Sequence, residues 1–124
     1  MRFIPTRVHG MLDYASGLLL IVAPYLFGFA DGTAAQYIPQ ALGAGILLMS
    51  LITDYEFSLA KLVPMPVHLG VDVAGGLLLA ASPWLFGFAD RVYWPHLILG
   101  LAEIGAGLMT RTAPDAQAGA ALRA

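Results

Sequence analysis

The sequence contains a direct repeat of one apolar segment. Residues 8–31 align without a gap with residues 67–90, at an offset of 59, and 15 of the 24 aligned positions are identical. The identical positions include the polar residues His9 and His68, and Asp13 and Asp72. Because shared apolar composition alone does not reproduce such positions, we infer that the chain is built from two copies of one structural unit.

Each copy continues into a second apolar segment, so the chain has four such segments, at about 8–30, 38–53, 67–89 and 94–110. Their lengths are near the roughly 20 residues that a helix needs to cross about 30 Å of hydrocarbon, and longer than the strands of a membrane barrel. Hydrophobic residues make up 59% of the chain and charged residues 11%. The pattern predicts an all-α fold, a four-transmembrane-helix bundle made of two two-helix repeats.

The repeats set the expected domain organisation. We predict a single membrane domain over residues 1–124, with the first repeat at about 8–54, the second at about 67–111 and a flexible tail at 112–124. Because each repeat crosses the membrane twice, both copies have the same orientation. They are then related by a pseudo-two-fold axis along the membrane normal.

Basic residues are distributed unevenly over the predicted loops. Arg91 lies on the side of the two short loops, and the side of the termini and central loop holds Arg2, Arg7, Lys61, Arg111 and Arg123. The positive-inside rule therefore predicts that both termini are cytoplasmic. Aromatic residues gather at the opposite ends of the helices, where we expect an interfacial belt. These residues are Tyr25, Phe27, Phe29, Tyr37, Trp84, Phe86, Phe88, Tyr93 and Trp94.

Several function classes are disfavoured by composition and motif content. A net charge of −2 provides no basic field for nucleic acid, and the absence of cysteine excludes thiol chemistry and thiolate metal sites. The sequence has no recognisable nucleophile motif, phosphate-binding loop or metalloprotease motif. We therefore predict that the chain is not an enzyme. Its expected partners are the lipid bilayer and further copies of itself or a larger membrane complex.

The string Ser82-Pro83-Trp84, within an apolar hairpin that is duplicated, resembles the SPW-repeat family of small bacterial integral membrane proteins. The resemblance covers nearly the whole chain. In the first repeat the tripeptide is Ala23-Pro24-Tyr25, so a role that requires the serine hydroxyl or the indole does not carry over to that copy. The resemblance implies a multi-pass protein of the bacterial cytoplasmic (inner) membrane and no established chemistry.

Pro24 and Pro83 should interrupt their helices. A proline inside a helix removes one backbone hydrogen bond and clashes with the preceding turn, so we expect a kink or a restart, with Ser82 as a cap of the restarted turn. Two interpretations stay open: a structural bend that lays the following Leu-Phe-Gly-Phe segment along the interface, or an unwound segment that binds an ion or solute.

His9 and Asp13, like His68 and Asp72, are spaced i and i+4, so each pair shares one face of its helix near the cytoplasmic end. Three interpretations stay open for these candidate polar or ion-site residues. The pairs are structural, or they bind a proton or a divalent cation, or the two histidines ligate haem. The sequence does not decide whether a metal binds, and we predict no cofactor.

Glu103 lies about halfway along the fourth predicted helix, where the first repeat has Ile46 or Leu47. A charged group at this depth costs at least about 2.5 kcal/mol, so Glu103 should be protonated, paired or facing a wet cavity. We expect a structural or accessory protein that acts through helix packing. The alternatives are proton, cation or small-solute transport through the His/Asp pairs and Glu103, and a haem-binding electron-transfer subunit.

Overall fold

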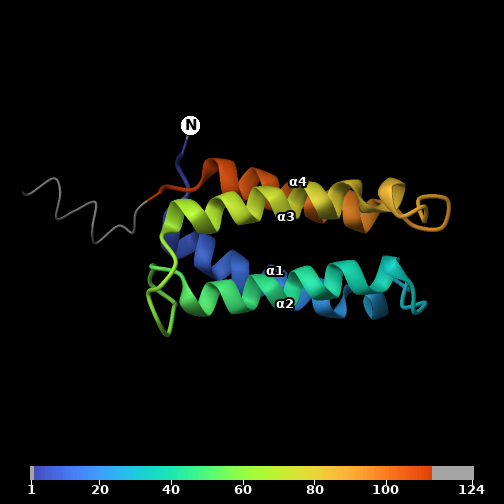
Figure 1. The fold of residues 1–124 in the computed structure, drawn as a ribbon, viewed down its shortest axis with the longest axis horizontal. Coiled ribbons are helices and arrows are strands. Elements are labelled where there is room, and N and C mark those ends of the chain that lie inside the picture. Colours follow the sequence, from blue (N-terminus) through green and yellow to red (C-terminus); the bar gives the residue numbers. More distant parts are fainter. Residues whose placement is uncertain (1, 113–124) are drawn as a thin grey trace, which may run out of the picture.

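The protein, seen here in a computed structural model that describes residues 2–112, forms four helices in that range (Figure 1). They are α1 (Thr6–Leu26), α2 (Ala34–Ile52), α3 (Met65–Leu85) and α4 (Trp94–Met109). No strand is present in the described range, and α1 and α3 run in the same direction. The predicted all-α bundle of two parallel two-helix repeats is confirmed. Of the predicted tail at 112–124, residues 113–124 lie outside the described range.

The ends of α1 and α3 differ from the prediction because a helix-capping motif stops each helix early. Gly28 and Gly87 adopt positive φ angles of 75° and 74°. The backbone N–H of the next residue, Phe29 or Phe88, then donates to the carbonyl oxygen of Pro24 or Pro83, at 2.8 Å in each case. This is a Schellman cap, which requires a left-handed residue that glycine adopts readily.

Pro24 and Pro83 lie inside these helices, which continue through them to Leu26 and Leu85. The predicted restart at each proline is therefore wrong. In α2 the first residue is Ala34 and Thr33 caps it, so Pro39 lies in the second turn instead of opening the helix. Thr33 accepts a hydrogen bond from the backbone N–H of Ala35, which satisfies one of the free donors at this end.

Within each repeat, glycines bring the two helices into direct backbone contact. A Cβ atom on Gly43 of α2 would lie 2.6 Å from the carbonyl oxygen of Gly17 in α1. A Cβ on Gly100 of α4 would lie 2.7 Å from the carbonyl oxygen of Gly76 in α3. Small residues permit this close approach of membrane helices. The matching contacts align Gly43 with Gly100, and hence Ile46, rather than Leu47, with Glu103.

The segment before each first helix crosses the end of the second helix of the other repeat. Ile4 N–H donates to the carbonyl oxygen of Met109 at 2.9 Å, and Val63 N–H donates to that of Ile52 at 2.8 Å. These contacts satisfy carbonyl groups that the ends of α4 and α2 would otherwise leave free. The two repeats are therefore connected at this end of the bundle by equivalent backbone contacts.

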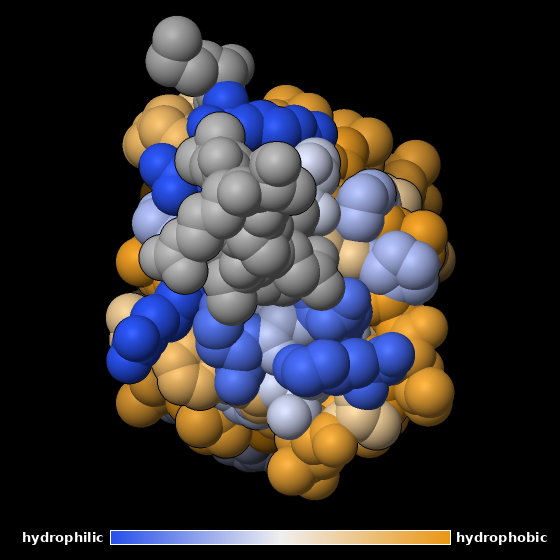
Figure 2. Space-filling view, turned by 90° about the vertical axis from the view of Figure 1, so that its left-hand side faces the viewer, coloured by the Kyte–Doolittle hydropathy of each residue, from blue (hydrophilic) through white to orange (hydrophobic). Residues whose placement is uncertain are grey.

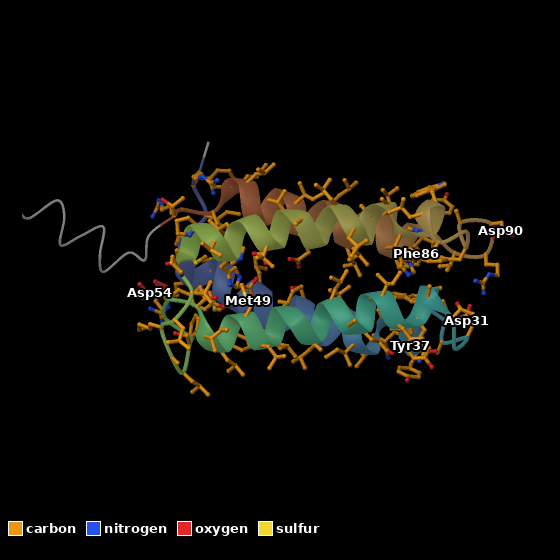
Figure 3. The ribbon with its side chains drawn as sticks, in the orientation of Figure 1. Asp31, Tyr37, Met49, Asp54, Phe86 and Asp90 are labelled. Carbon is orange, nitrogen blue, oxygen red and sulfur yellow. The ribbon has the colours of Figure 1, made fainter. Side chains whose placement is uncertain are left out.

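The two ends of the bundle differ in composition. The N-terminus, the central loop and the end of α4 lie at one end, where hydrophilic residues gather and hydrophobic residues line the flanks (Figures 1 and 2). Asp31 and Asp90 mark the short loops at the other end, with Tyr37 and Phe86 nearby (Figure 3). Arg91 pairs there with Asp31 and connects the two short loops.

The helices differ in how well they fit a membrane span by length and composition. Among the described residues, α2 and α3 are long and apolar enough to cross a membrane, and α4 is apolar but has 16 residues. Arg7, His9 and Asp13 make the first half of α1 polar. Large apolar side chains such as Leu18, Leu48 and Leu101 are exposed on the flanks of the bundle.

Candidate functional site

His9, Asp13, His68 and Asp72 come together between the two repeats, and we call this group the His/Asp cluster. Each histidine lies one turn inside its helix, and its aspartate follows one turn later. All four side chains are buried. The sequence predicted two pairs at equal depth; the structure joins the two pairs into one group, with donor atoms that all lie within 4.8 Å of one another.

The contacts of the cluster run within and between the repeats. His9 Nε2 lies 3.1 Å from Asp13 Oδ1 in its own helix and 2.8 Å from Asp72 Oδ2 in the other repeat. His68 Nε2 lies 3.3 Å from Asp72 Oδ2 and 3.0 Å from Asp13 Oδ2. The Nε2 atom of each histidine therefore faces two carboxylates, one from each repeat.

Two threonines that were not predicted from the sequence orient the imidazoles. Thr110 Oγ1 lies 2.7 Å from His9 Nδ1, and Thr53 Oγ1 lies 2.6 Å from His68 Nδ1. Each hydroxyl already donates its proton to a carbonyl in its own helix, Ala106 or Met49, at 2.6 Å. The threonine oxygens are therefore acceptors, and each Nδ1 carries the proton. The sequence signal that could have identified them is their equivalent position, because each threonine directly follows the second helix of its repeat.

Tyr55 adds a contact on one side of the cluster and was also not predicted. The central loop lies over α1, where Gly10 has no side chain that would obstruct Tyr55 and Phe57. The buried Tyr55 hydroxyl donates to Asp13 Oδ2 at 3.1 Å. Burial and the nearby Asp13 charge raise the pKa of Tyr55, so this phenol stays protonated and remains a donor.

Glu103 lies outside the cluster and faces a cavity. The cavity has a volume of about 130 Å³ and is lined mainly by apolar residues of α2 and α3, among them Met49 (Figure 3). Glu103 and Asp72 are its two acidic lining residues. Glu103 Oε2 is buried and makes no hydrogen bond with the described residues. A cavity is one of the three environments predicted for Glu103, and this cavity is mainly apolar.

His96 is buried near the other end of the bundle, between Phe29 and Phe88, whose ring centroids each lie 4.9 Å from its own. Both phenylalanines are buried inside the bundle, so the prediction that they belong to the interfacial aromatic belt is wrong. His96 Nε2 donates to the carbonyl oxygen of Ala35 at 2.7 Å. Pro39 cannot donate to that carbonyl, because proline has no N–H. His96 thus supplies the hydrogen bond that Pro39 removes.

Comparison with known protein families matches residues 7–110 to the SPW repeat domain. The chain belongs to the SPW repeat family. No curated protein and no solved structure matches the chain significantly. Family membership and the long apolar helices together identify a membrane protein.

The three residues of the SPW motif have different environments. Ser82 and Pro83 are buried and Trp84 is exposed. Ser82 Oγ donates to the carbonyl oxygen of Leu79 at 2.7 Å, so the predicted cap is wrong. Pro83 lacks the N–H that would bond this carbonyl, and Ser82 replaces the missing donor.

The first SPW repeat shares the arrangement without the hydroxyl. Pro24 is buried in α1, Tyr25 is exposed, and Ala23 occupies the place of Ser82. Tyr25 and Trp84 are exposed, together with Phe27 and Phe86, as the predicted aromatic belt requires of them. The motif forms the closing turn of an intact helix, which gives no support to an unwound binding segment.

Proposed function

We propose that this SPW repeat protein has a structural or accessory role in the bacterial cytoplasmic membrane, with both termini in the cytoplasm and no catalytic role. The main support is the His/Asp cluster, whose buried side chains connect the two repeats. The exposed apolar flanks provide contact area for lipid, further copies of the chain or a larger membrane complex. No cofactor and no nucleic acid is part of this proposal.

The proposed orientation is tested by cysteine labelling, because the natural chain has no cysteine. Asp90→Cys places a thiol in an outer loop and Thr112→Cys places one beyond α4; both positions are exposed. In intact cells a membrane-impermeant maleimide should label the first variant, and label the second only after the membrane is broken. The reverse pattern would contradict the orientation.

A second candidate function is the transport of protons or cations. The cavity of about 130 Å³ supports it, because this cavity reaches Asp72 of the cluster and Glu103. Intramembrane carboxylates frequently mark ion pathways. A path across the whole membrane from one four-helix bundle would require more than this cavity, so transport would involve an oligomer.

Flux measurements decide between the two functions. The unaltered protein, Glu103→Gln and the outer-loop control Asp90→Asn are reconstituted in liposomes that contain a pH-sensitive or metal-sensitive dye. A structural role predicts that all three give the flux of empty liposomes. A flux supported by the unaltered protein and by Asp90→Asn, and lost in Glu103→Gln, would establish transport instead.

The haem alternative fits the geometry poorly. Ligation by two histidines requires a porphyrin plane between the two Nε2 atoms. Here each Nε2 faces the Asp13 and Asp72 carboxylates at 2.8–3.3 Å, and all four side chains are buried. We therefore propose no haem, and an absorption spectrum of the purified protein without a Soret band is the expected result.

A further inference from the structure

We propose that the His/Asp cluster is a mononuclear site for a divalent transition metal, with Zn²⁺ as the ion that fits best. This inference goes beyond the structural role and does not depend on transport. It rests on the spacing of the donor atoms, the direction of the imidazoles, one unsatisfied nitrogen and the charge of the group.

The spacing of the donors is close to the edges of a four-ligand site. The four nitrogen-to-oxygen distances between histidines and aspartates are 3.1, 2.8, 3.0 and 3.3 Å, with His9 nearest Oδ1 of Asp13 and His68 nearest Oδ2, and one ligand atom from each residue lies within 4.8 Å of the others. Zn²⁺ bonded to imidazole nitrogen and carboxylate oxygen at about 2.0–2.2 Å in a tetrahedron separates its ligand atoms by about 3.3 Å. A small opening of the group therefore admits the ion.

The direction of the imidazoles is the one that metal ligation requires. Thr110 and Thr53 accept hydrogen bonds from Nδ1 of His9 and His68, so both Nε2 atoms point to the centre of the group. Metal-bound histidines commonly donate their other ring N–H to an oxygen in this way, which fixes the tautomer and the ring. The threonines thus form the outer shell of the proposed site, one from each repeat.

The hydrogen bonds within the cluster leave one nitrogen unsatisfied. His68 Nε2 is buried and makes no hydrogen bond with the described residues, although Asp13 Oδ2 is 3.0 Å away. His9 Nε2 has two carboxylate neighbours, and a single N–H cannot point at both. A cation at the centre satisfies all four groups at once, whereas two N–H donors do not.

Charge and ligand type select the ion. Two carboxylates and two neutral imidazoles carry a charge of −2, which a divalent ion neutralises; two protons on the imidazoles would neutralise it as well, so the ion enters by replacing protons. Imidazole favours zinc and neighbouring transition metals over Mg²⁺ and Ca²⁺, and the absence of cysteine disfavours Cu⁺. The tetrahedral spacing favours Zn²⁺ within this set.

The experiment uses the purified full chain in detergent, with any purification tag removed and bound metal stripped by a chelator. Titration with Co²⁺ should give the visible bands of a tetrahedral site, saturating at one ion per chain, and Zn²⁺ should abolish these bands. His68→Ala and Asp72→Asn should lose this binding. His96→Gln, which alters the buried histidine outside the cluster, should bind like the unaltered protein.

Because the cluster also joins the repeats, a cluster variant that fails to fold would report on stability alone. Thr110→Val keeps all four ligands and should weaken Zn²⁺ binding by roughly 10–100-fold. X-ray absorption of zinc on the unaltered protein should show four nitrogen and oxygen ligands, with two imidazoles. Binding that is absent, that persists undiminished in folded His68→Ala, or that involves no imidazole would overturn the proposal.

Discussion

At the scale of single residues, the threonines at the ends of α2 and α4 fix the chemistry of the two cluster histidines. Thr53 and Thr110 donate to backbone carbonyls, so each can only accept from the adjacent Nδ1. His96 is held in the opposite way, because its Nε2 donates to the Ala35 carbonyl. The oxygen acceptor outside the cluster thus faces Nδ1 in His9 and His68, and Nε2 in His96.

This difference can be measured, since the chain has three histidines. With ¹⁵N-labelled histidine, a long-range nitrogen–proton correlation spectrum in detergent should show protonated Nδ1 for His9 and His68, and protonated Nε2 with an unprotonated Nδ1 for His96. Single replacements assign the signals. Bare, unprotonated Nδ1 atoms in His9 and His68 would contradict the role given to the threonines.

Ser82 provides a second test at this scale. Ser82→Ala leaves the Leu79 carbonyl without a donor, because Pro83 supplies none, and should lower the free energy of unfolding by about 1–3 kcal/mol. Thermal unfolding in detergent measures the loss, and a Ser82→Ala variant as stable as the unaltered protein would refute the role of Ser82.

At the scale of the helices, the sequence predicted the number, type and order of elements better than their ends. The apolar segments predict four helices because a membrane requires long apolar runs with internally satisfied backbone groups. Their ends depend on local capping. Gly28 and Gly87 stop α1 and α3 inside apolar sequence, and Thr33 starts α2 before Pro39. An average over hydropathy does not detect such single-residue effects.

Glycine contacts within the repeats give a prediction at this scale. Gly100→Ala should destabilise the protein by about 1–3 kcal/mol, because its Cβ would lie 2.5 Å from the backbone nitrogen of Ala80. Gly105 lies in the same helix, and a Cβ there meets nothing within 4 Å. Gly105→Ala should be neutral or stabilising by up to about 1 kcal/mol. Thermal unfolding in detergent compares the two, and a tolerated Gly100→Ala would argue against the close packing of α3 and α4.

At the scale of the whole molecule, the repeat predicted the approximate symmetry but not how the two units meet. The i, i+4 spacing placed His9 with Asp13 and His68 with Asp72 on single helices, whereas the contacts of His9 with Asp72 and of His68 with Asp13 depend on the packing of separate hairpins. Thr53, Thr110 and Tyr55 reach the cluster through turns and a loop that hydrophobic periodicity does not describe. Glu103 was identified because a carboxylate is costly in an apolar helix.

The central claim is that the cluster joins the two SPW repeats, and a double-mutant cycle between His9 and Asp72 tests it most directly. The free energy of unfolding is measured for the unaltered protein, His9→Ala, Asp72→Asn and the double variant, in detergent and with metal removed. For groups in contact we expect a coupling energy of about 0.5–3 kcal/mol. A control cycle between His9 and His96, which lie in different parts of the bundle, should give a value near zero. Additive effects of His9→Ala and Asp72→Asn would contradict the claim.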